Sequence, residues 1–350
     1  MSSANPLFLP PLILGTATFN NQYNHSPHSL PTTTIIHRAL AAGISAFDTS
    51  PYYGPAELLL AAALSTSSHH RSSYHLLTKV GRIAANTFDY SPAWIRASVA
   101  RSLHRLNTTY LDVVYCHDVE FVSPPEVIAA VRTLRALRDE GLVRYIGISG
   151  YPTNVLVDLS LLVLGETGEP LDAVMSYAHY TLQNTALAQH GVLGRLLEDA
   201  RVGCVLNGSP LGMGLLRSQG VPVGGMGDFH PAPLELRLRC AEASGACGEA
   251  GEKLESVALR FALEGWTRDG AKGGTVVGGG GRGGEGKMGI SVAGVSYLHE
   301  LEELLVIWKE VKKVAEKRQL EERVRGVFGK EWSDYSWPSP GVGFTRESKL

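Results

Sequence analysis

Four side chains that can share proton-transfer chemistry lie in the first third of the sequence: Asp48, Tyr53, Lys79 and His117. A phenol with a pKa near 10 transfers protons poorly at neutral pH, but a nearby ammonium lowers that pKa by about 1–3 units, and a carboxylate can hold the ammonium in place. We therefore expect Tyr53 to be the general acid/base, with Lys79 as its activator and Asp48 as the partner of Lys79. A neutral His117 would orient the substrate oxygen.

A tyrosine of this kind protonates an alkoxide when a hydride arrives, or deprotonates a hydroxyl when a hydride leaves. The hydride carrier itself must be an organic cofactor. Each of the four residues also has a structural interpretation when taken alone: helix cap, packing residue, solvated charge and structural histidine, in that order. Their positions in the fold decide between the two interpretations.

The surrounding sequence alternates apolar runs of strand length with helical patterns. Several helical patterns begin at Ser-Pro or Pro and several end near Gly, as helix termini prefer. The runs predict strands at 12–17, 44–47, 74–80, 111–117, 143–149, 173–177, 202–207 and 290–295. The helical patterns are 32–42, 56–64, 92–106, 124–139, 153–164, 187–200, 253–264 and 298–317.

Alternation of this kind predicts a parallel sheet covered by helices, and eight units over about 300 residues favour a closed α/β fold, the (β/α)8 TIM barrel. The glycine fingerprint of a Rossmann fold is missing after the first strand, at 15–20. The carboxyl ends of barrel strands converge on one mouth. Asp48, Tyr53, Lys79 and His117 are therefore expected to share a pocket.

Three segments depart from the alternation within what we expect to be a single barrel domain over 1–350. Residues 212–250 form a long Gly- and Pro-containing connection, which could be a lid over the mouth, a mobile loop or an unstructured insertion. Residues 267–289 contain a glycine-rich run without Gly-Lys-Ser/Thr, which predicts a flexible surface insertion rather than a P-loop. The tail, 330–350, carries aromatic residues that could pack across the barrel or contact a second subunit.

The composition favours a protein that acts on small molecules. The 350 residues are 44% apolar, which suits one large core, and the net charge of −2 gives no basic stripe for nucleic acid or an anionic membrane. The first residues lack a signal-peptide pattern, and no apolar run approaches the roughly 20 residues of a membrane span. His25, His28, His69 and His70 lack carboxylate or cysteine partners at ligand spacing, so no metal is expected. Cysteines without a CxxC pair predict reduced thiols in a cytoplasmic protein: Cys116, Cys204, Cys240 and Cys247.

The runs 47–54, 77–80 and 111–118 together resemble the aldo-keto reductase superfamily, whose tetrad is Asp, Tyr, Lys and His in this order. The resemblance covers about residues 10–310. It implies the barrel fold and a nicotinamide dinucleotide bound in an extended form across the mouth. Further runs match as well: 14–19, 143–149 and 209–216.

The resemblance also implies a set of cofactor-binding residues, with departures from the family pattern. Ser149-Gly150 stands where many members have Ser-Asn, and Ser176-Tyr177 stands where they have a Gln. Gly208 replaces the aromatic residue that stacks on the nicotinamide, so Tyr177 is expected to supply an aromatic surface. The expected cofactor-binding residues are Ser149, Ser176, Tyr177, Ser209, Leu211, Gly294, Ser296 and Glu303.

The last strand and the helix behind it bear on the choice of cofactor. Residues 294–297 would receive the adenosine side, and the helix carries Glu300 and Glu303, with Leu304 where the family often has Asn. A 2′-phosphate requires an Arg or Lys clamp, whereas carboxylates repel it. NAD is therefore expected rather than NADP, unless Arg282 and Lys287 of the glycine-rich run fold onto the site.

The runs 147–152, 176–180 and 207–210 are most similar to the sugar-dehydrogenase branch of the superfamily, which holds D-arabinose 1-dehydrogenases and L-galactose dehydrogenases. We therefore expect an NAD-dependent aldose 1-dehydrogenase that oxidises the anomeric hydroxyl to a lactone, with D-arabinose as first choice and L-galactose as second. The alternatives are an NADPH-dependent carbonyl reductase and a non-catalytic cofactor-binding regulatory subunit. The oligomeric state stays open.

Overall fold

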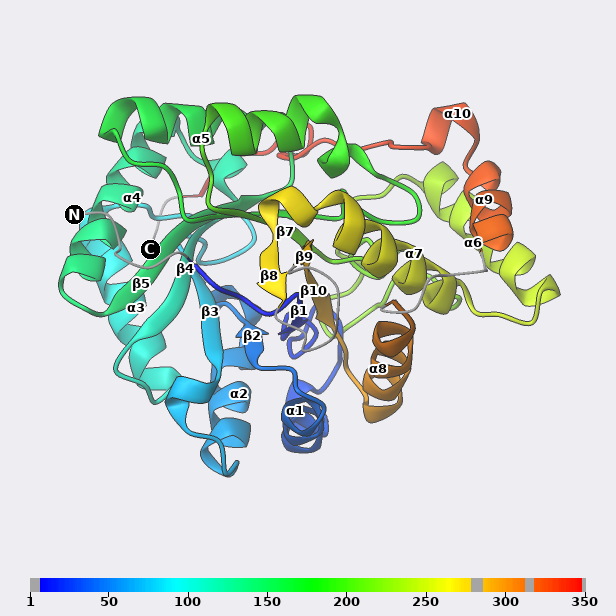
Figure 1. Ribbon diagram of the computed structural model, residues 1–350, viewed down its shortest axis with the longest axis horizontal. Coiled ribbons are helices and arrows are strands. Elements are labelled where there is room, and N and C mark those ends of the chain that lie inside the picture. Colours follow the sequence, from blue (N-terminus) through cyan, green and yellow to red (C-terminus); the bar gives the residue numbers. More distant parts are fainter. Residues whose placement is uncertain (1–6, 278–285, 312–317, 348–350) are drawn as a thin grey trace.

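The computed structural model describes residues 7–277, 286–311 and 318–347, in which eight parallel strands close into a barrel (Figure 1). Each barrel strand pairs with the barrel strand that precedes it in the chain, and the last pairs with the first. This confirms the predicted (β/α)8 TIM barrel. The barrel strands are β1 (Leu12–Gly15), β2 (Ala46–Asp48), β3 (His75–Val80), β4 (Leu111–His117), β5 (Val143–Gly150), β6 (Ala173–Tyr177), β7 (Cys204–Gly208) and β10 (Ile290–Gly294).

Helices cover the outside of the barrel, and two of them begin at the Ser-Pro signals seen in the sequence. Ser91 Oγ accepts the N–H of Trp94, 3.3 Å away, at the start of α3. Ser123 and Glu126 cap the start of α4 reciprocally. The barrel helices are α1 (Thr32–Ala41), α2 (Ala56–Ser65), α3 (Pro92–Arg105), α4 (Pro124–Asp139), α5 (Thr153–Thr167), the π-helical segment η6 (His190–Asp199), α7 (Leu254–Asp269) and α8 (Leu298–Val311).

The core has two layers, as expected for this fold. Inward-facing side chains such as Leu77, Tyr115 and Leu206 fill the barrel interior, and the outward faces of the strands pack against the helices. Gly147 on β5 makes room for the Tyr115 ring, because an added Cβ would lie 2.6 Å from the Tyr115 Cδ1. The interior is thus packed with side chains, and the open space lies at the strand ends.

The connection at 212–250 is not a wholly irregular insertion, because it contains the helix α6 (Leu234–Glu249). Its buried stripe is Leu236, Cys240, Ala243 and Cys247, at helical spacing but built mostly from small side chains. This stripe packs with residues of α9 (Arg318–Val327), which the sequence also did not reveal. Figure 1 shows α6, α9 and the short α10 (Gly329–Trp332) grouped beyond α7, on the side of the barrel away from α3 and α4.

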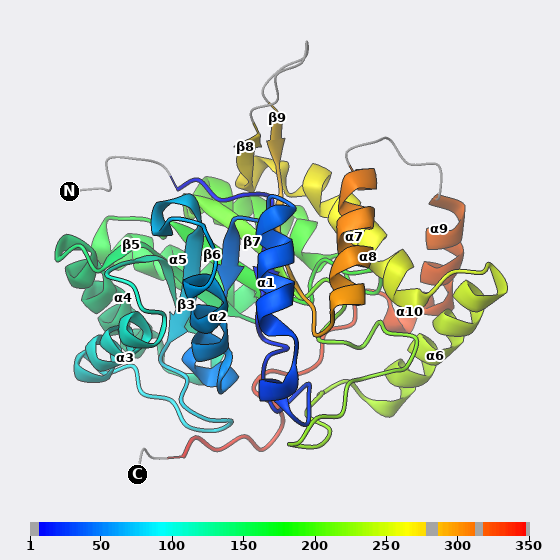
Figure 2. The ribbon, with the colours of Figure 1, turned by 90° about the horizontal axis from the view of Figure 1, so that it is seen from below.

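The segment at 267–289 also has regular structure where the structure describes it. It begins with the last turn of α7 and contains an antiparallel pair, β8 (Thr275–Val277) with β9 (Gly286–Met288). Figure 2 shows this pair at the opposite end of the barrel from the C-terminal tail. Among the described residues, no helix has the length and apolarity to cross a membrane.

Candidate active site

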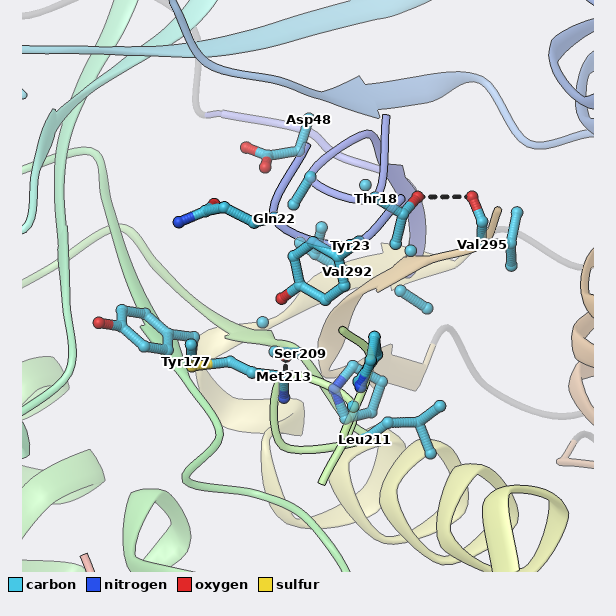
Figure 3. Close-up of a pocket in the computed structure, with 18 of the residues that line it drawn as sticks. Thr18, Gln22, Tyr23, Asp48, Tyr177, Ser209, Leu211, Met213, Val292 and Val295 are labelled. Atoms are coloured by element: carbon cyan, nitrogen blue, oxygen red, sulfur yellow. Dashed lines mark hydrogen bonds between the residues drawn. The ribbon is translucent and has the colours of Figure 1, made fainter. Parts of the chain in front are cut away.

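A cavity of about 430 Å³ opens at the carboxyl ends of the barrel strands (Figure 3). Strands β2, β3 and β4 and the turn η2 (Pro51–Tyr53) bring Asp48, Tyr53, Lys79 and His117 to its wall. The four residues singled out in the sequence therefore line one cavity. In Figure 3, Asp48 lies on the side of the cavity opposite Leu211.

Asp48 and Lys79 form a buried ion pair at the bottom of this cavity. Lys79 Nζ is 2.6 Å from Asp48 Oδ1 and 3.0 Å from the Thr49 carbonyl oxygen, and the Lys79 side chain is 2% exposed. Lys79 is therefore not a solvated charge. Asp48 Oδ2 is buried and has no hydrogen-bond partner among the described residues. Burial raises the pKa of Asp48, and Lys79 acts in the opposite direction.

His117 is held beside the pair as a neutral imidazole. Its Nδ1 lies 3.2 Å from Ser50 Oγ, the same oxygen that accepts the N–H of Tyr52 and starts η2. Burial lowers the pKa of His117 to about 3, so the ring carries no charge at neutral pH. The predicted neutral state of His117 thus has a physical cause in this site.

Tyr53 lies between the imidazole and the ammonium. Its ring centroid is 5.8 Å from that of His117, at an interplanar angle of 87°, and 4.8 Å from Lys79 Nζ. Burial, followed by the negative charges of Asp48 and Asp118, raises the pKa of Tyr53 well above its usual value. The prediction of a lowered Tyr53 pKa is therefore wrong, because burial and the charges of Asp48 and Asp118 dominate. The phenol is protonated at neutral pH.

Residues that sequence reasoning missed form the wall next to His117. Arg82 and Asp118 make an ion pair there, and the Arg82 guanidinium lies 4.1 Å from the Tyr52 ring centroid. Gln22 Nε2 donates to the Tyr52 hydroxyl at 3.2 Å. A signal was present in the sequence, since Asp118 directly follows His117 and Arg82 comes soon after Lys79.

Six of the eight expected cofactor-binding residues line the cavity: Ser149, Tyr177, Ser209, Leu211, Gly294 and Glu303. Tyr177 pairs in register with Gly208, so the ring from β6 stands beside the position where the aromatic residue is missing. Ser209 adopts a left-handed φ of 56°, and its Oγ accepts the N–H of Met213 at 2.7 Å (Figure 3). Their contacts with a cofactor remain a prediction.

Ser176 and Ser296 do not line this cavity. The Ser176 hydroxyl is buried and lies 3.1 Å from His179 Nδ1, so it serves the packing behind β6. Ser296 Oγ accepts from Asn24 Nδ2 at 3.0 Å and lies in a neighbouring recess. Sequence reasoning placed both side chains on the cavity side, whereas local hydrogen bonds hold them elsewhere.

The cavity extends from the tetrad to the start of α8, where acids and bases face each other. Arg217 Nη2 donates to Glu300 Oε1 at 2.9 Å, and Lys253 Nζ lies 3.8 Å from Glu303 Oε2. All four residues line the cavity. An elongated cavity with cations along it fits a dinucleotide, which carries phosphates between its two bases.

Arg217 and Lys253 were not predicted, and the two basic residues that were named do not take their place. Lys287 lies on β9, which leads into the amino end of β10, away from the cavity. Arg282 lies outside the described residues. The basic groups near α8 therefore come from the 212–250 connection and the start of α7.

The connection between β7 and α6 crosses the cavity and meets the loop after β1. Met226 donates its N–H to the Asn21 carbonyl at 3.1 Å, and a Cβ on Gly224 would lie 2.3 Å from that same oxygen. Phe229 packs on Tyr23 at 4.9 Å between ring centroids, and both line the cavity. Of the alternatives for this segment, the cover over the mouth matches these contacts.

The C-terminal tail packs across the loops at the mouth. Trp337 stacks on Tyr151 at 4.5 Å between ring centroids, and Ser339 Oγ lies 2.9 Å from Glu120 Oε1. Phe344 packs on Phe121 at 4.9 Å between ring centroids. Packing across the barrel, one of the two alternatives for the tail, is thus what these contacts describe.

Two other expectations from the sequence concern thiols and metals. The four cysteines are free and buried. Within the described part of the chain, no group of three or more His, Cys, Asp or Glu side chains could hold a metal ion.

Comparison with known proteins gives the chain its family. Residues 11–323 match the sequence model of the aldo/keto reductase family. The chain is 44% identical to D-arabinose 1-dehydrogenase of Saccharomyces cerevisiae over 74% of this chain and 77% of that protein. It is 36% identical to L-galactose dehydrogenase of Arabidopsis thaliana, over 65% of this chain and 68% of that protein. It is also 28% identical to D-threo-aldose 1-dehydrogenase of a Pseudomonas species, over 75% of this chain and 86% of that protein.

This family implies a nicotinamide cofactor, which the elongated cavity beside the tetrad fits. The resemblance noted in the motifs around Asp48, Lys79 and His117 is confirmed by a match that spans most of the chain. The chain therefore belongs to the aldo/keto reductase family and is an oxidoreductase.

Proposed function

We propose that this protein is an NAD-dependent aldose 1-dehydrogenase that oxidises the anomeric hydroxyl of a sugar to a lactone. The observation that carries the proposal is the tetrad geometry: a buried Lys79–Asp48 pair at 2.6 Å next to Tyr53, with a neutral His117 on the other side of the phenol. A donor, an acceptor and a fixed charge pair at one cavity suit proton transfer at a carbon that exchanges a hydride.

The chain's own residues account for the proton in this reaction. A nicotinamide cofactor held in the cavity would supply the acceptor for the hydride that leaves C1. Tyr53, as the phenolate, accepts the proton of the anomeric hydroxyl. The sugar thus loses one hydride, which carries both electrons, and one proton, and a C=O bond forms at C1. His117 holds the reacting oxygen through a ring nitrogen. In the reverse reaction the protonated Tyr53 donates its proton to the alkoxide oxygen.

The relatives guide the choice of sugar. Their names give D-arabinose, L-galactose and D-threo-aldoses as substrates. In sugar stereochemistry, D-arabinose and L-galactose share the configuration at C2, C3 and C4, and both have the D-threo arrangement at C2 and C3. We infer that the substrate of this protein is an aldose with this arrangement, D-arabinose first and L-galactose second.

The choice of NAD over NADP is supported by the charges at the end of the cavity near α8. Glu300 accepts from Arg217 and from the N–H of Ser296 at 2.7 Å, so this arginine is already engaged. Glu303 contacts the Ser256 hydroxyl and lies near Lys253. Glu300 and Glu303 already pair with the nearby Arg217 and Lys253, so this end of the cavity disfavours a 2′-phosphate.

A carbonyl reductase that uses NADPH is the second candidate, favoured by one observation. The protonated state of Tyr53 suits donation to a carbonyl oxygen, and Lys253, 62% exposed, could turn from Glu303 toward a phosphate. Under this proposal, the same tetrad runs in the reducing direction.

Purified protein assayed with a panel of aldoses and both dinucleotides, followed by the absorbance of the reduced cofactor, distinguishes the two. We expect oxidation of D-arabinose with NAD at a higher kcat/KM than with NADP, and a much lower rate with D-ribose, its epimer at C2. Reduction of aldehydes with NADPH, without oxidation of any aldose, would contradict the dehydrogenase proposal.

A further inference from the structure

Arg82 and Asp118 form a charged pair in the cavity wall that exchanges no proton in the proposed reaction, although both charges act on the pKa of Tyr53. Arg82 Nη1 donates to Asp118 Oδ2, and the two side chains are 16% and 3% exposed. Both residues line the cavity. Asp118 directly follows His117, which places the pair beside the reacting centre but outside the Tyr53–Lys79–Asp48 arrangement.

The surrounding structure fixes the pair in place. Arg82 also donates from Nη2 to the Ala85 carbonyl at 3.1 Å, and its guanidinium lies over the Tyr52 ring. Asp118 adopts a left-handed φ of 55°, which Asp tolerates better than most non-glycine residues. A preorganised pair of this kind is suited to binding a ligand in one orientation.

The pair retains hydrogen-bonding capacity toward the cavity. The contacts of the Asp118 carboxylate with Arg82 Nη1 and, at 3.6 Å, with His117 Nε2 are both made by Oδ2, and a guanidinium has five N–H donors, of which Arg82 uses three. Tyr52 and Gln22 line the same cavity and add a hydroxyl and an amide. In Figure 3, the side chains of Gln22 and Tyr177 extend to the same side, away from the contact between Thr18 and Val295.

The net charge of the pair selects among ligands. An isolated Arg82 would attract a carboxylate, and an isolated Asp118 would attract an ammonium group. Together they offer an acceptor and donors at little net charge, which matches adjacent hydroxyl groups, where one hydroxyl donates and its neighbour accepts. A neutral polyol has this pattern, whereas an acid or an amine does not.

We propose that the Arg82–Asp118 pair binds hydroxyl groups of the sugar other than the reacting one, and that its balanced charge selects neutral sugars over acidic ones. This proposal rests on the proposed aldose dehydrogenase function and deepens it. The two residues are binding residues, because they contact the substrate without exchanging the proton.

The test uses two variants that unbalance the charge in opposite directions, Asp118→Asn and Arg82→Gln. We expect each to lower kcat/KM for D-arabinose by about 10–100-fold, mainly through KM, because a hydrogen bond to a charged group is lost. Binding of 4-formylbenzoate, an anionic aldehyde, to the protein with bound dinucleotide should tighten about tenfold in Asp118→Asn and weaken in Arg82→Gln. Binding of benzaldehyde, its neutral analogue, should stay unchanged.

A matched control removes a similar Arg–Asp pair away from the cavity. Asp228, on the connection before α6, pairs with Arg237 of α6, and neither lines the cavity. Asp228→Asn should leave D-arabinose kinetics and both aldehyde affinities within twofold of the unmodified protein. Thermal unfolding and dinucleotide affinity, measured on every variant, separate loss of folding from loss of recognition.

The outcomes for this proposal and for the dehydrogenase function are distinguishable. If the protein oxidises no aldose, the proposed dehydrogenase function is wrong. The aldehyde affinities would still test whether the Arg82–Asp118 pair selects ligands by charge. Opposite shifts for the anionic aldehyde in the two variants support the pair as a charge selector. Unchanged aldehyde affinities, or an unaltered KM for D-arabinose in both variants, would overturn the proposal. A change in kcat alone does not decide it, because both charges also act on the pKa of Tyr53.

Discussion

Asp48 at the mouth of the barrel and Asp112 near its base are both buried carboxylates that contact basic side chains. Asp112, on β4, accepts from Arg71 at 2.6 Å, from Arg144 at 3.0 Å and from the N–H of Leu76 at 2.9 Å. Asp48 accepts from Lys79 alone through its side chain, and its Oδ2 is unpaired among the described residues. One carboxylate is fully satisfied and the other is not.

The pKa directions follow from this difference. Burial acts to raise both pKa values, but at Asp112 the contacts with His75, Arg71 and Leu76 outweigh it and hold the pKa below its usual value. At Asp48 burial outweighs Lys79, and the pKa is raised. A depressed carboxyl pKa stabilises the folded state at neutral pH, whereas a raised one costs stability. Asp112, near the base of the barrel, thus stabilises the fold. Asp48, at the mouth, keeps one unpaired carboxylate oxygen beside the residue proposed to transfer the proton.

The largest effect should come from the phenol at the mouth. Tyr53→Phe should lower turnover by about 10²–10⁴-fold, the usual contribution of a general acid/base. The free energy of unfolding should change little, because the Tyr53 hydroxyl has no hydrogen-bond partner among the described residues. Steady-state kinetics and urea unfolding check the two halves. Full turnover in this variant would support the cofactor-binding regulatory subunit instead.

Substitution of Asp112, near the base of the barrel, should have the opposite result: stability falls and turnover is unchanged. Asp112→Asn should lower the free energy of unfolding by about 1.5–3 kcal/mol, because it removes the charge of a buried carboxylate that accepts from Arg71, Arg144 and the N–H of Leu76. In the folded protein, kcat should be unchanged, since Asp112 lies at the amino end of β4, away from the cavity. Urea unfolding together with kcat per folded molecule measures both. A loss of kcat that matched that of Tyr53→Phe would remove the distinction between mouth and base.

The contribution of Asp112 to the free energy of unfolding should depend on pH, and the depressed pKa fixes the direction. Because the folded-state pKa of Asp112 is depressed, its contribution is fully present above the unfolded-state pKa of about 3.9 and is lost as pH falls through the lower folded-state value. The stability difference between the unmodified protein and Asp112→Asn should therefore shrink below about pH 4.

Sequence reasoning predicted the barrel and the tetrad because both depend on local signals. Strand-length apolar runs with helical patterns between them fix the alternation, and parallel strands bring their carboxyl ends together whatever the loops do. Asp48, Lys79 and His117 could be placed from strand ends alone. Their mutual distances follow from the barrel geometry.

The predictions that the structure does not support depend on side-chain contacts that spacing in the sequence does not show. The pKa of Tyr53 is set by burial and by the charges of Asp48, Asp118 and Arg82, which follow three different barrel strands or end one of them. Helix α6 buries a stripe of mostly small residues, and Val324 and Phe328 belong to the same apolar cluster. The pattern within α6 alone does not show that this cluster forms. Ser176 faced away from the cavity because His179, three residues later, takes its hydroxyl.

Catalysis at the mouth should depend on pH through the raised pKa of Tyr53. Aldose oxidation requires the phenolate, so log(kcat/KM) should rise with pH by about one unit per pH unit while Tyr53 remains protonated. The reduction of a carbonyl requires the phenol and should be flat over the same range. His117, with a pKa of about 3, should contribute no transition near neutral pH. Profiles in both directions test this, and an oxidation rate that falls as pH rises would contradict the role of Tyr53.

The smallest effect on the free energy of unfolding should come from removing both charges of the Asp48–Lys79 pair at once. In the double variant Asp48→Ala with Lys79→Met, neither charge is left buried alone, and replacing a buried ion pair by apolar groups is often neutral or stabilising by about 1–4 kcal/mol. We expect an unfolding free energy equal to or above that of the unmodified protein, with turnover lost. The single variant Lys79→Met is the control, because it leaves Asp48 uncompensated. A double variant as destabilised as Asp112→Asn would show that the mouth pair, like the cluster at the base, holds the barrel together.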